Sequence, residues 1–89
     1  MLRSAAETLA LKAIAWSASE GTLGEFLAAS GLKIDDLRRG VGDSELLAAF
    51  LDFILARDGL IQAFCEAEEI NPQILHEARR ALPGAAVDG

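Results

Sequence analysis

The stretch LLAAFLDFILA, residues Leu46 to Ala56, decides which fold this chain can adopt. Asp52 is the only charged residue among these eleven. A helix that is apolar on nearly all sides is a buried one, and eleven residues at a rise of about 1.5 Å each are too short to cross a bilayer. We therefore predict that this stretch forms the central core helix, that Asp43 or Ser44 caps it, and that the other helices pack around it.

The composition of the whole chain favours a small helical domain. Its 89 residues fit one domain, and 52% of them are hydrophobic, many of them Ala and Leu, which are the best helix formers. We predict an all-α fold, a compact bundle of five to six short helices over residues 1–83, followed by a flexible tail at residues 84–89. Because so short a chain can bury only a limited core, we expect some apolar surface to stay exposed.

Apolar residues at helical spacing and helix-capping signals predict five further short helices. These predicted helices cover residues 4–19, 22–31, 34–39, 59–68 and 72–82. Ser4 with Glu7, and Thr22 with Glu25, have the spacing of a capping box. The pair Asn71-Pro72 supplies a capping side chain and a proline at the first helical position.

One phrase occurs nearly twice in the chain. EGTLGEFLAASGLKIDDL, residues 20–37, is similar to DGLIQAFCEAEEINPQIL, residues 58–75. At an offset of 38 residues, the identical pairs include Ala18/Ala56, Gly21/Gly59, Phe26/Phe64, Ala29/Ala67 and Leu37/Leu75. We interpret the matches as inward positions and a turn glycine, which predicts two pseudo-repeated helical halves around the central helix. The alternative is that two amphipathic helix–turn–helix units merely look alike.

The charge pattern bears on nucleic-acid binding. The segment FLAASGLKIDDLRRGV, residues 26–41, has some likeness to a DNA-binding helix-turn-helix. However, its would-be recognition helix begins with Asp35 and Asp36, where such a helix approaches the phosphates, and the chain has a net charge of −6. Since phosphate contacts need a basic surface, DNA binding is a disfavoured alternative and we expect no nucleic-acid partner.

The single cysteine and the N-terminal segment indicate in which cellular compartment the protein resides. Cys65 has no second cysteine with which to form an internal disulfide, which fits a reducing environment. Glu7 and Lys12 interrupt the apolar run that a signal peptide would need, and no stretch has the length of a membrane span. We therefore expect a cytoplasmic protein with no membrane partner.

We predict no catalytic, cofactor-binding or metal-binding residues in this chain. Cys65 and His76 could form a nucleophile and base in a pocket between the halves, which is the enzymatic or small-ligand alternative. A free cysteine, however, is usually buried and inert, and a lone histidine usually lies at the surface. Glu66 and Glu69 share a helix face, but a metal site needs more ligands than this cluster offers.

We therefore predict a non-enzymatic protein that binds another protein or itself, a homodimer being one such form. Trp16 is a candidate anchor, because a partly exposed tryptophan often dominates a protein interface. The other candidates lie where the two halves differ in sequence. The predicted interaction surface consists of Trp16, Cys65, Glu66, Glu68, Glu69, His76 and Arg79.

The order and spacing of six segments give the chain a family resemblance. These segments are AAETLALKAIAW (5–16), FLAASG (26–31), DLR (36–38), LAAFLDFIL (47–55), AFC (63–65) and ARRALPG (78–84). With them, the chain resembles a family of small, mainly alphaproteobacterial proteins known as domain of unknown function 3572. The resemblance implies an intracellular bacterial protein, and it implies no particular activity.

Overall fold

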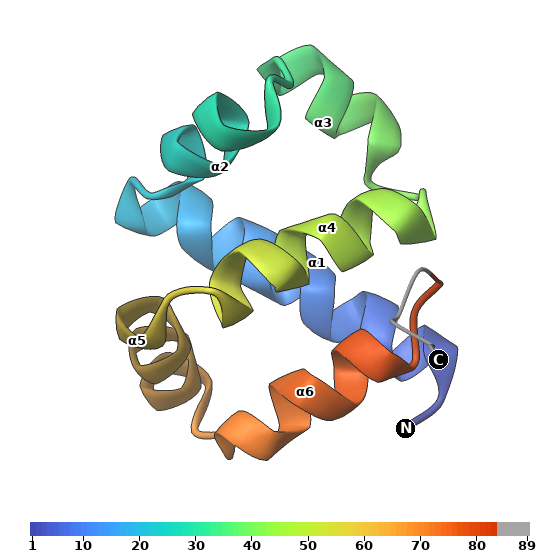
Figure 1. Ribbon diagram of the computed structural model, residues 1–89, viewed down its shortest axis with the longest axis vertical. Coiled ribbons are helices and arrows are strands. Elements are labelled where there is room, and N and C mark those ends of the chain that lie inside the picture. The colour runs from blue at the N-terminus through green and yellow to red at the C-terminus, as the bar shows by residue number, and fades with distance from the viewer. Residues whose placement is uncertain (84–89) are drawn as a thin grey trace.

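The computed structural model describes residues 1–83, and six α-helices account for most of them (Figure 1). The helices are α1 (Arg3–Glu20), α2 (Leu23–Ser30), α3 (Ile34–Gly40), α4 (Ser44–Leu55), α5 (Asp58–Glu68) and α6 (Pro72–Arg80). No strand occurs in this described part of the chain. The predicted all-α bundle is therefore confirmed, with six helices. The predicted tail, residues 84–89, lies outside the described residues.

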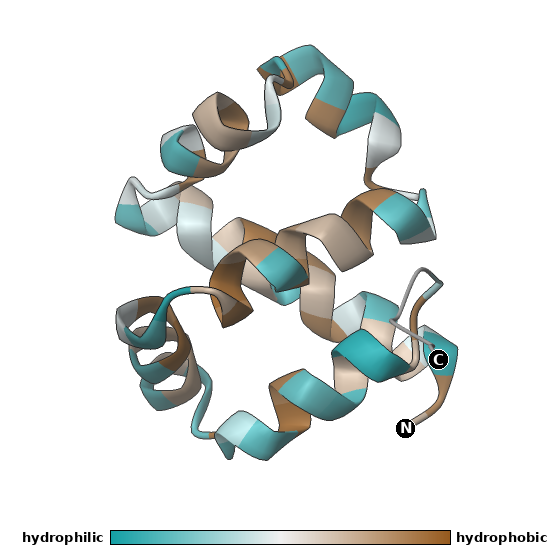
Figure 2. Cartoon of the chain, in the orientation of Figure 1, coloured by the Kyte–Doolittle hydropathy of each residue, from teal (hydrophilic) through white to brown (hydrophobic). Residues whose placement is uncertain are grey.

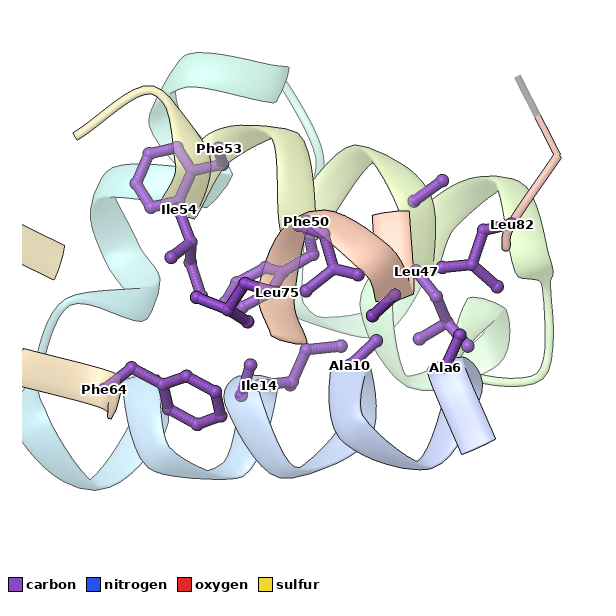
Figure 3. Close-up of a cluster of buried hydrophobic side chains, with 14 of the residues drawn as sticks. Ala6, Ala10, Ile14, Leu47, Phe50, Phe53, Ile54, Phe64, Leu75 and Leu82 are labelled. Atoms are coloured by element: carbon purple, nitrogen blue, oxygen red, sulfur yellow. The ribbon is translucent and has the colours of Figure 1, made fainter. Parts of the chain in front are cut away.

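Helix α4 is the buried centre of the bundle. It crosses α1 in the middle of the molecule and also packs against α5 and α6 (Figure 1). Leu47, Phe50, Leu51 and Ile54 are at most 1% exposed, and Figure 3 shows several of these side chains directed toward α1 and α6. The prediction of a central core helix is confirmed. Asp43 is its cap, because the carboxylate accepts the Glu45 backbone N–H at 2.9 Å.

Helix α1 packs against the core through small side chains. Ala6, Ala10, Ala13 and Ser17 are all fully buried, and their spacing of four, three and four residues places them on one face. Small residues on this face allow the neighbouring helices α4 and α6 to approach closely. Figure 2 shows hydrophobic colour along α1 and α4 at the centre and hydrophilic colour over much of α3 and α6.

A polar cluster joins the first turns of α1 and α4. Arg3 Nη2 donates to Ser44 Oγ at 2.8 Å, and Ser44 Oγ in turn donates to Glu7 Oε2. Arg3 and Glu7 also form an ion pair at 3.4 Å within α1. The buried hydroxyl of Ser44 is thereby satisfied, and the beginnings of the two central helices are fixed to each other.

Both predicted capping boxes are wrong, and the reason is local. Helix α1 begins at Arg3, so Ser4 lies inside the first turn, where its carbonyl accepts the Thr8 hydroxyl at 3.0 Å. The Thr22 backbone is helical rather than extended, and its hydroxyl donates backward to the Ser17 carbonyl at 3.5 Å. The Thr22 hydroxyl therefore adds a bond to the Ser17 carbonyl, which already accepts the Gly21 and Thr22 backbone N–H groups, and it caps no N–H of α2.

The predicted start of α6 is confirmed, whereas its predicted end is not. Asn71 Oδ1 accepts the Gln73 backbone N–H at 2.8 Å, and Pro72 is the first helical residue. The helix ends at Arg80 rather than Leu82. Leu82 is nevertheless only 3% exposed, so the turn that follows α6 continues to contribute to the core.

Equivalent residues in the two copies of the repeated phrase are buried at some positions and exposed at others. Phe26 and Phe64 are both buried, as are Leu37 and Leu75. Ala29 and Ala67, however, are both exposed, which contradicts their assignment as inward positions. Gly21 ends α1 in the left-handed conformation with φ 79°, whereas Gly59 lies in the first turn of α5, so this pair does not mark the same turn. The duplication stays a prediction.

Candidate functional site

A shallow, open hollow lies on the protein surface between helices α2 and α4. Its volume is about 320 Å³, and its lining is mostly apolar. Six residues line this α2/α4 hollow: Phe26, Ala29 and Ser30 from α2, and Ala49, Asp52 and Phe53 from α4. Two of its exposed lining residues, Ala29 and Ala49, are alanines, whose side chains are too short to fill the space between the helices.

The base of the α2/α4 hollow is aromatic and rigid. The rings of Phe26 and Phe53 meet edge to face with centroids 5.4 Å apart, and Phe26 meets Phe50 in the same way at 4.9 Å. Phe50 is fully buried, and the other two rings are at most 7% exposed. Edge-to-face aromatic pairs stabilise one another beyond the area that they bury. The hollow therefore has a preformed apolar base.

Asp52 is the charged residue among those that line the hollow. Ser30 is occupied locally, because its hydroxyl donates to the Leu27 carbonyl at 3.4 Å and accepts the Leu32 N–H at 3.3 Å. The Asp52 side chain is 58% exposed, and one of its oxygens, Oδ1, accepts Arg79 Nε at 2.6 Å. The hollow thus combines aromatic and methyl surfaces with one carboxylate at its rim.

Arg79, one of the sequence-predicted surface residues, joins α6 to α4. Besides its ion pair with Asp52, Arg79 donates from Nη1 to the Pro83 carbonyl at 3.3 Å. Its side chain is only 14% exposed. Arg79 therefore contacts the rim of the hollow through Asp52 and is largely covered itself.

Trp16 and Cys65 belong largely to the interior. Trp16 is half-buried, and its ring meets Phe64 edge to face with centroids 5.4 Å apart, which joins α1 to α5. Cys65 is 5% exposed, and burial raises the pKa of its thiol above the ordinary value. A neutral, buried thiol is a poor nucleophile, because the thiolate is the reactive form.

The acidic candidates and the histidine lie mainly outside the core. Glu66, Glu69 and His76 are exposed and Glu68 is half-buried. Glu69 ends α5 with a positive φ of 57°, in the left-handed region that glycine usually occupies. Among residues 1–83, no three or more His, Cys, Asp or Glu side chains gather as a metal ion would require. The prediction that the seven candidates form one interaction surface stays a prediction.

A second, more polar hollow lies elsewhere on the surface. Met1, Glu77, Arg80 and Ala81 line it, and its volume is about 250 Å³. Neither this hollow nor the α2/α4 hollow includes Cys65 or His76. Throughout residues 1–83, no helix is both long and apolar enough to cross a membrane.

The sequence placed Phe26 and Phe53 in the core but gave no reason to pair α2 with α4 at the surface. One local signal was present: Asp52 interrupts an otherwise apolar helix, with Ala49 one turn before it. The approach of residues 26–30 to residues 49–53 depends on tertiary packing, and periodicity within either helix cannot report it.

No curated protein and no solved structure matches this chain. One family model, described as "Protein of unknown function (DUF3572)", matches residues 3–85 and so covers nearly the whole sequence. The resemblance given by the sequence segments is confirmed, and the chain belongs to the DUF3572 family.

Proposed function

We propose that this chain is a non-enzymatic interaction module that binds a partner protein through the α2/α4 hollow. The observation that supports the proposal is the lining: aromatic rings at the base, alanine methyl groups at the walls and one carboxylate at the rim. At protein interfaces, an anchoring side chain of one partner commonly enters a pocket of the other.

The enzymatic alternative has less support. It needed Cys65 as a nucleophile with His76 as its base, yet Cys65 is buried while His76 is exposed. Burial also raises the pKa of the Cys65 thiol and so favours its unreactive neutral form. The same burial would protect the thiol, and the absence of a second cysteine fits the reducing cytoplasm, where we place the module.

Self-association is the second form that the module can take. Leu11 is 42% exposed on the outer side of α1, away from the buried alanines, so a second copy could cover it. Sedimentation velocity across a range of concentrations tests this form. A concentration-dependent dimer that Leu11→Ser disperses would support self-association, and a monomer at all concentrations would exclude it.

Partner capture from the host with matched bait proteins tests the proposed function. The wild type, Ala49→Trp and Ala15→Trp serve as baits, and mass spectrometry identifies the captured proteins. Ala49 and Ala15 are both exposed helical alanines, but only Ala49 lines the hollow. We expect a protein that the wild type and Ala15→Trp capture and Ala49→Trp loses. Equal capture by all three baits, or no reproducible capture, would contradict the proposal.

The capture experiment depends on bait proteins that fold. Circular dichroism and the thermal midpoint of each bait therefore accompany it. Ala29→Arg provides a second blocking variant from the opposite wall, because Ala29 is exposed and belongs to a different helix. A partner lost with both blocking variants, each with an unchanged thermal midpoint, assigns the binding to the hollow.

A further inference from the structure

Helix α3 is bounded at each end by a glycine-containing turn. Gly31 ends α2 with a φ of 78°, a left-handed conformation that glycine adopts freely. At the other end, residues 41–42 form a turn, and a Cβ at either Gly31 or Gly42 would meet nothing within 4 Å. Residues 32–42, which we call the α3 strap, thus lie between two points at which the backbone can change direction without meeting a neighbour.

The polar contacts of the α3 strap are local. Its described hydrogen bonds and ion pairs join groups at most four residues apart in the chain. Its two ion pairs, Arg38 with Asp35 at 3.9 Å and Arg39 with Asp36 at 2.7 Å, lie within α3. Helices α1 and α6, in contrast, are joined to α4 by polar side chains. Among the described residues, movement of the strap away from the core therefore breaks no ion pair to another helix.

One side chain holds the α3 strap against the core. Leu37 is 3% exposed and is the buried residue of the strap, whereas Leu32 is half-buried and Ile34 and Val41 are exposed. Figure 1 shows α3 at the edge of the molecule, beyond α2 and α4, and it has no extensive contact with another helix. Elements with few buried apolar contacts open at a low cost in free energy. Leu37 is therefore the main contact that keeps the strap closed.

The packing of α4 does not depend on the α3 strap. Helix α4 packs against α1, α5 and α6, and α1 also packs against α2 and α6. The cap of α4 lies outside the strap, because Asp43 follows it and its carboxylate accepts the Glu45 backbone N–H at 2.9 Å. Helix α4 can therefore keep both its neighbours and its cap while the strap moves.

We propose that the α3 strap opens as one unit while the other five described helices stay folded. The backbone turns at Gly31 and at residues 41–42, and Leu37 leaves the core. Leu46 loses the cover of the strap, because its side chain lies beside Gly40 in the closed form. The open form thus exposes apolar side chains that the closed form covers, and any condition that favours the open form shifts the balance between the two. This inference does not rest on the proposed function.

Native-state hydrogen exchange of the full chain tests the proposal. The backbone amides of residues 37–40 report on α3, and those of residues 48–54 report on α4. After correction for intrinsic rates, we expect the first set to exchange at least about 100-fold faster than the second. We also expect low concentrations of urea to change the rates of the first set little, because the opening exposes little surface. Equal protection of the two sets, or an equal dependence on urea, would overturn the proposal.

A variant in α6 distinguishes local opening from unfolding of the whole protein. Ala78 is fully buried in α6, so Ala78→Gly should destabilise the whole fold and speed exchange at residues 48–54 about fivefold. Residues 37–40 should keep their exchange rates, because Ala78 is packed equally in the closed and the open form. Equal acceleration of both sets would mean that α3 opens only when the whole protein unfolds, which overturns the proposal.

Two variants within α3 test the role of Leu37. Leu37→Ala removes the buried contact, so we expect residues 37–40 to exchange at least about tenfold faster than in the wild type. Ile34→Ala is the matched control, because Ile34 is 45% exposed on the same helix, and it should leave these rates within about twofold. Equal rates in the two variants would overturn the assignment of Leu37 as the contact that keeps the strap closed. If Leu37→Ala does not fold, the comparison of the wild type with Ala78→Gly decides the proposal.

Discussion

Helices α3 and α6 hold corresponding places in the two halves of the chain, but they pack very differently. Helix α6 lies against α1, α4 and α5, whereas α3 has no extensive contact with any other helix. Helix α6 buries Leu75 and Ala78, and Leu82 continues the same stripe just beyond it. Helix α3 buries only Leu37.

The difference arises from the second apolar position in each helix. At the offset of the repeat, Leu37 corresponds to Leu75, but Gly40 stands where Ala78 stands in α6. The Leu46 side chain occupies the space beside Gly40, so this end of α3 has no apolar side chain of its own to bury. A short helix is stabilised mainly by tertiary packing of its apolar face. Helix α3 is therefore held in place by one buried leucine, and it is packed far less extensively than α6.

The largest expected effect compares the two equivalent leucines. We expect Leu75→Ala to lower the free energy of unfolding by about 4 kcal/mol and Leu37→Ala by about 2 kcal/mol, within the usual range for buried leucines. The reason is that Leu75 is fully buried in a helix that packs against three others, whereas the loosely packed α3 can close part of the cavity. Chemical denaturation measures both values. An equal or larger loss for Leu37→Ala would contradict the difference between the halves.

The second effect compares the residues that end α2 and α5. Gly31 and Glu69 are equivalent positions of the repeated phrase, and both have a positive φ, 78° for Gly31 and 57° for Glu69. Because only glycine adopts this region freely, we expect Glu69→Gly to raise the free energy of unfolding by about 0.5–1 kcal/mol and Gly31→Ala to lower it by about 1 kcal/mol. Denaturation curves at neutral pH provide the measurement. If Glu69→Gly destabilises the protein, the Glu69 side chain contributes more than its backbone costs.

The third effect concerns the packing of the Leu46 side chain beside Gly40, at the position where α6 has Ala78. A Cβ at Gly40 would lie 2.6 Å from Leu46 Cδ2, whereas one at Gly42 would meet nothing within 4 Å. We expect Gly40→Ala to cost about 0.5–1 kcal/mol, because the flexible leucine can move, and Gly42→Ala to have no comparable cost. In a Leu46→Ala background the same change should become neutral or stabilising. Strict additivity in this double-mutant cycle would show that Leu46 does not pack on Gly40.

The smallest effect depends on pH and compares α5 with α2. Cys65 in α5 takes the place of Leu27 in α2, and burial raises the pKa of its thiol. As the pH rises, the thiol therefore ionises in the unfolded chain before it ionises in the folded protein, and this ionisation favours the unfolded chain. The contribution of the buried neutral thiol to stability is complete below the ordinary thiol pKa and is lost as the pH rises through the raised pKa of the folded protein. We expect stability to fall above about pH 8.5, and Cys65→Ala to remove that part of the fall. An identical alkaline profile for both proteins would contradict the burial of the thiol.

Local chemistry in the sequence was sufficient to predict much of the helical framework. The apolar run from Leu46 to Ala56 identifies a largely buried helix without knowledge of its neighbours, because Asp52 is its only charged residue. Asp43 and Asn71 could also be predicted as caps from local sequence, because each side chain accepts an N–H only two residues further along the chain. The capping boxes at Ser4 and Thr22 failed for different reasons. The N-cap position of α1 is Leu2, two residues before Ser4, and the Thr22 hydroxyl donates to the Ser17 carbonyl instead of accepting an N–H of α2.

The candidate site required the tertiary structure. The ion pair of Asp52 with Arg79 spans 27 residues, and the α2/α4 hollow joins residues about as far apart in the chain. No periodicity within one helix records such distances, and the exposed alanines that leave the hollow open look like ordinary helix formers in the sequence. Residues within a turn or two of one another are enough to predict that the chain is helical and that α4 is buried. Which helices meet depends instead on how side chains from distant parts of the chain fill the space between them, so it is known only once the chain is folded.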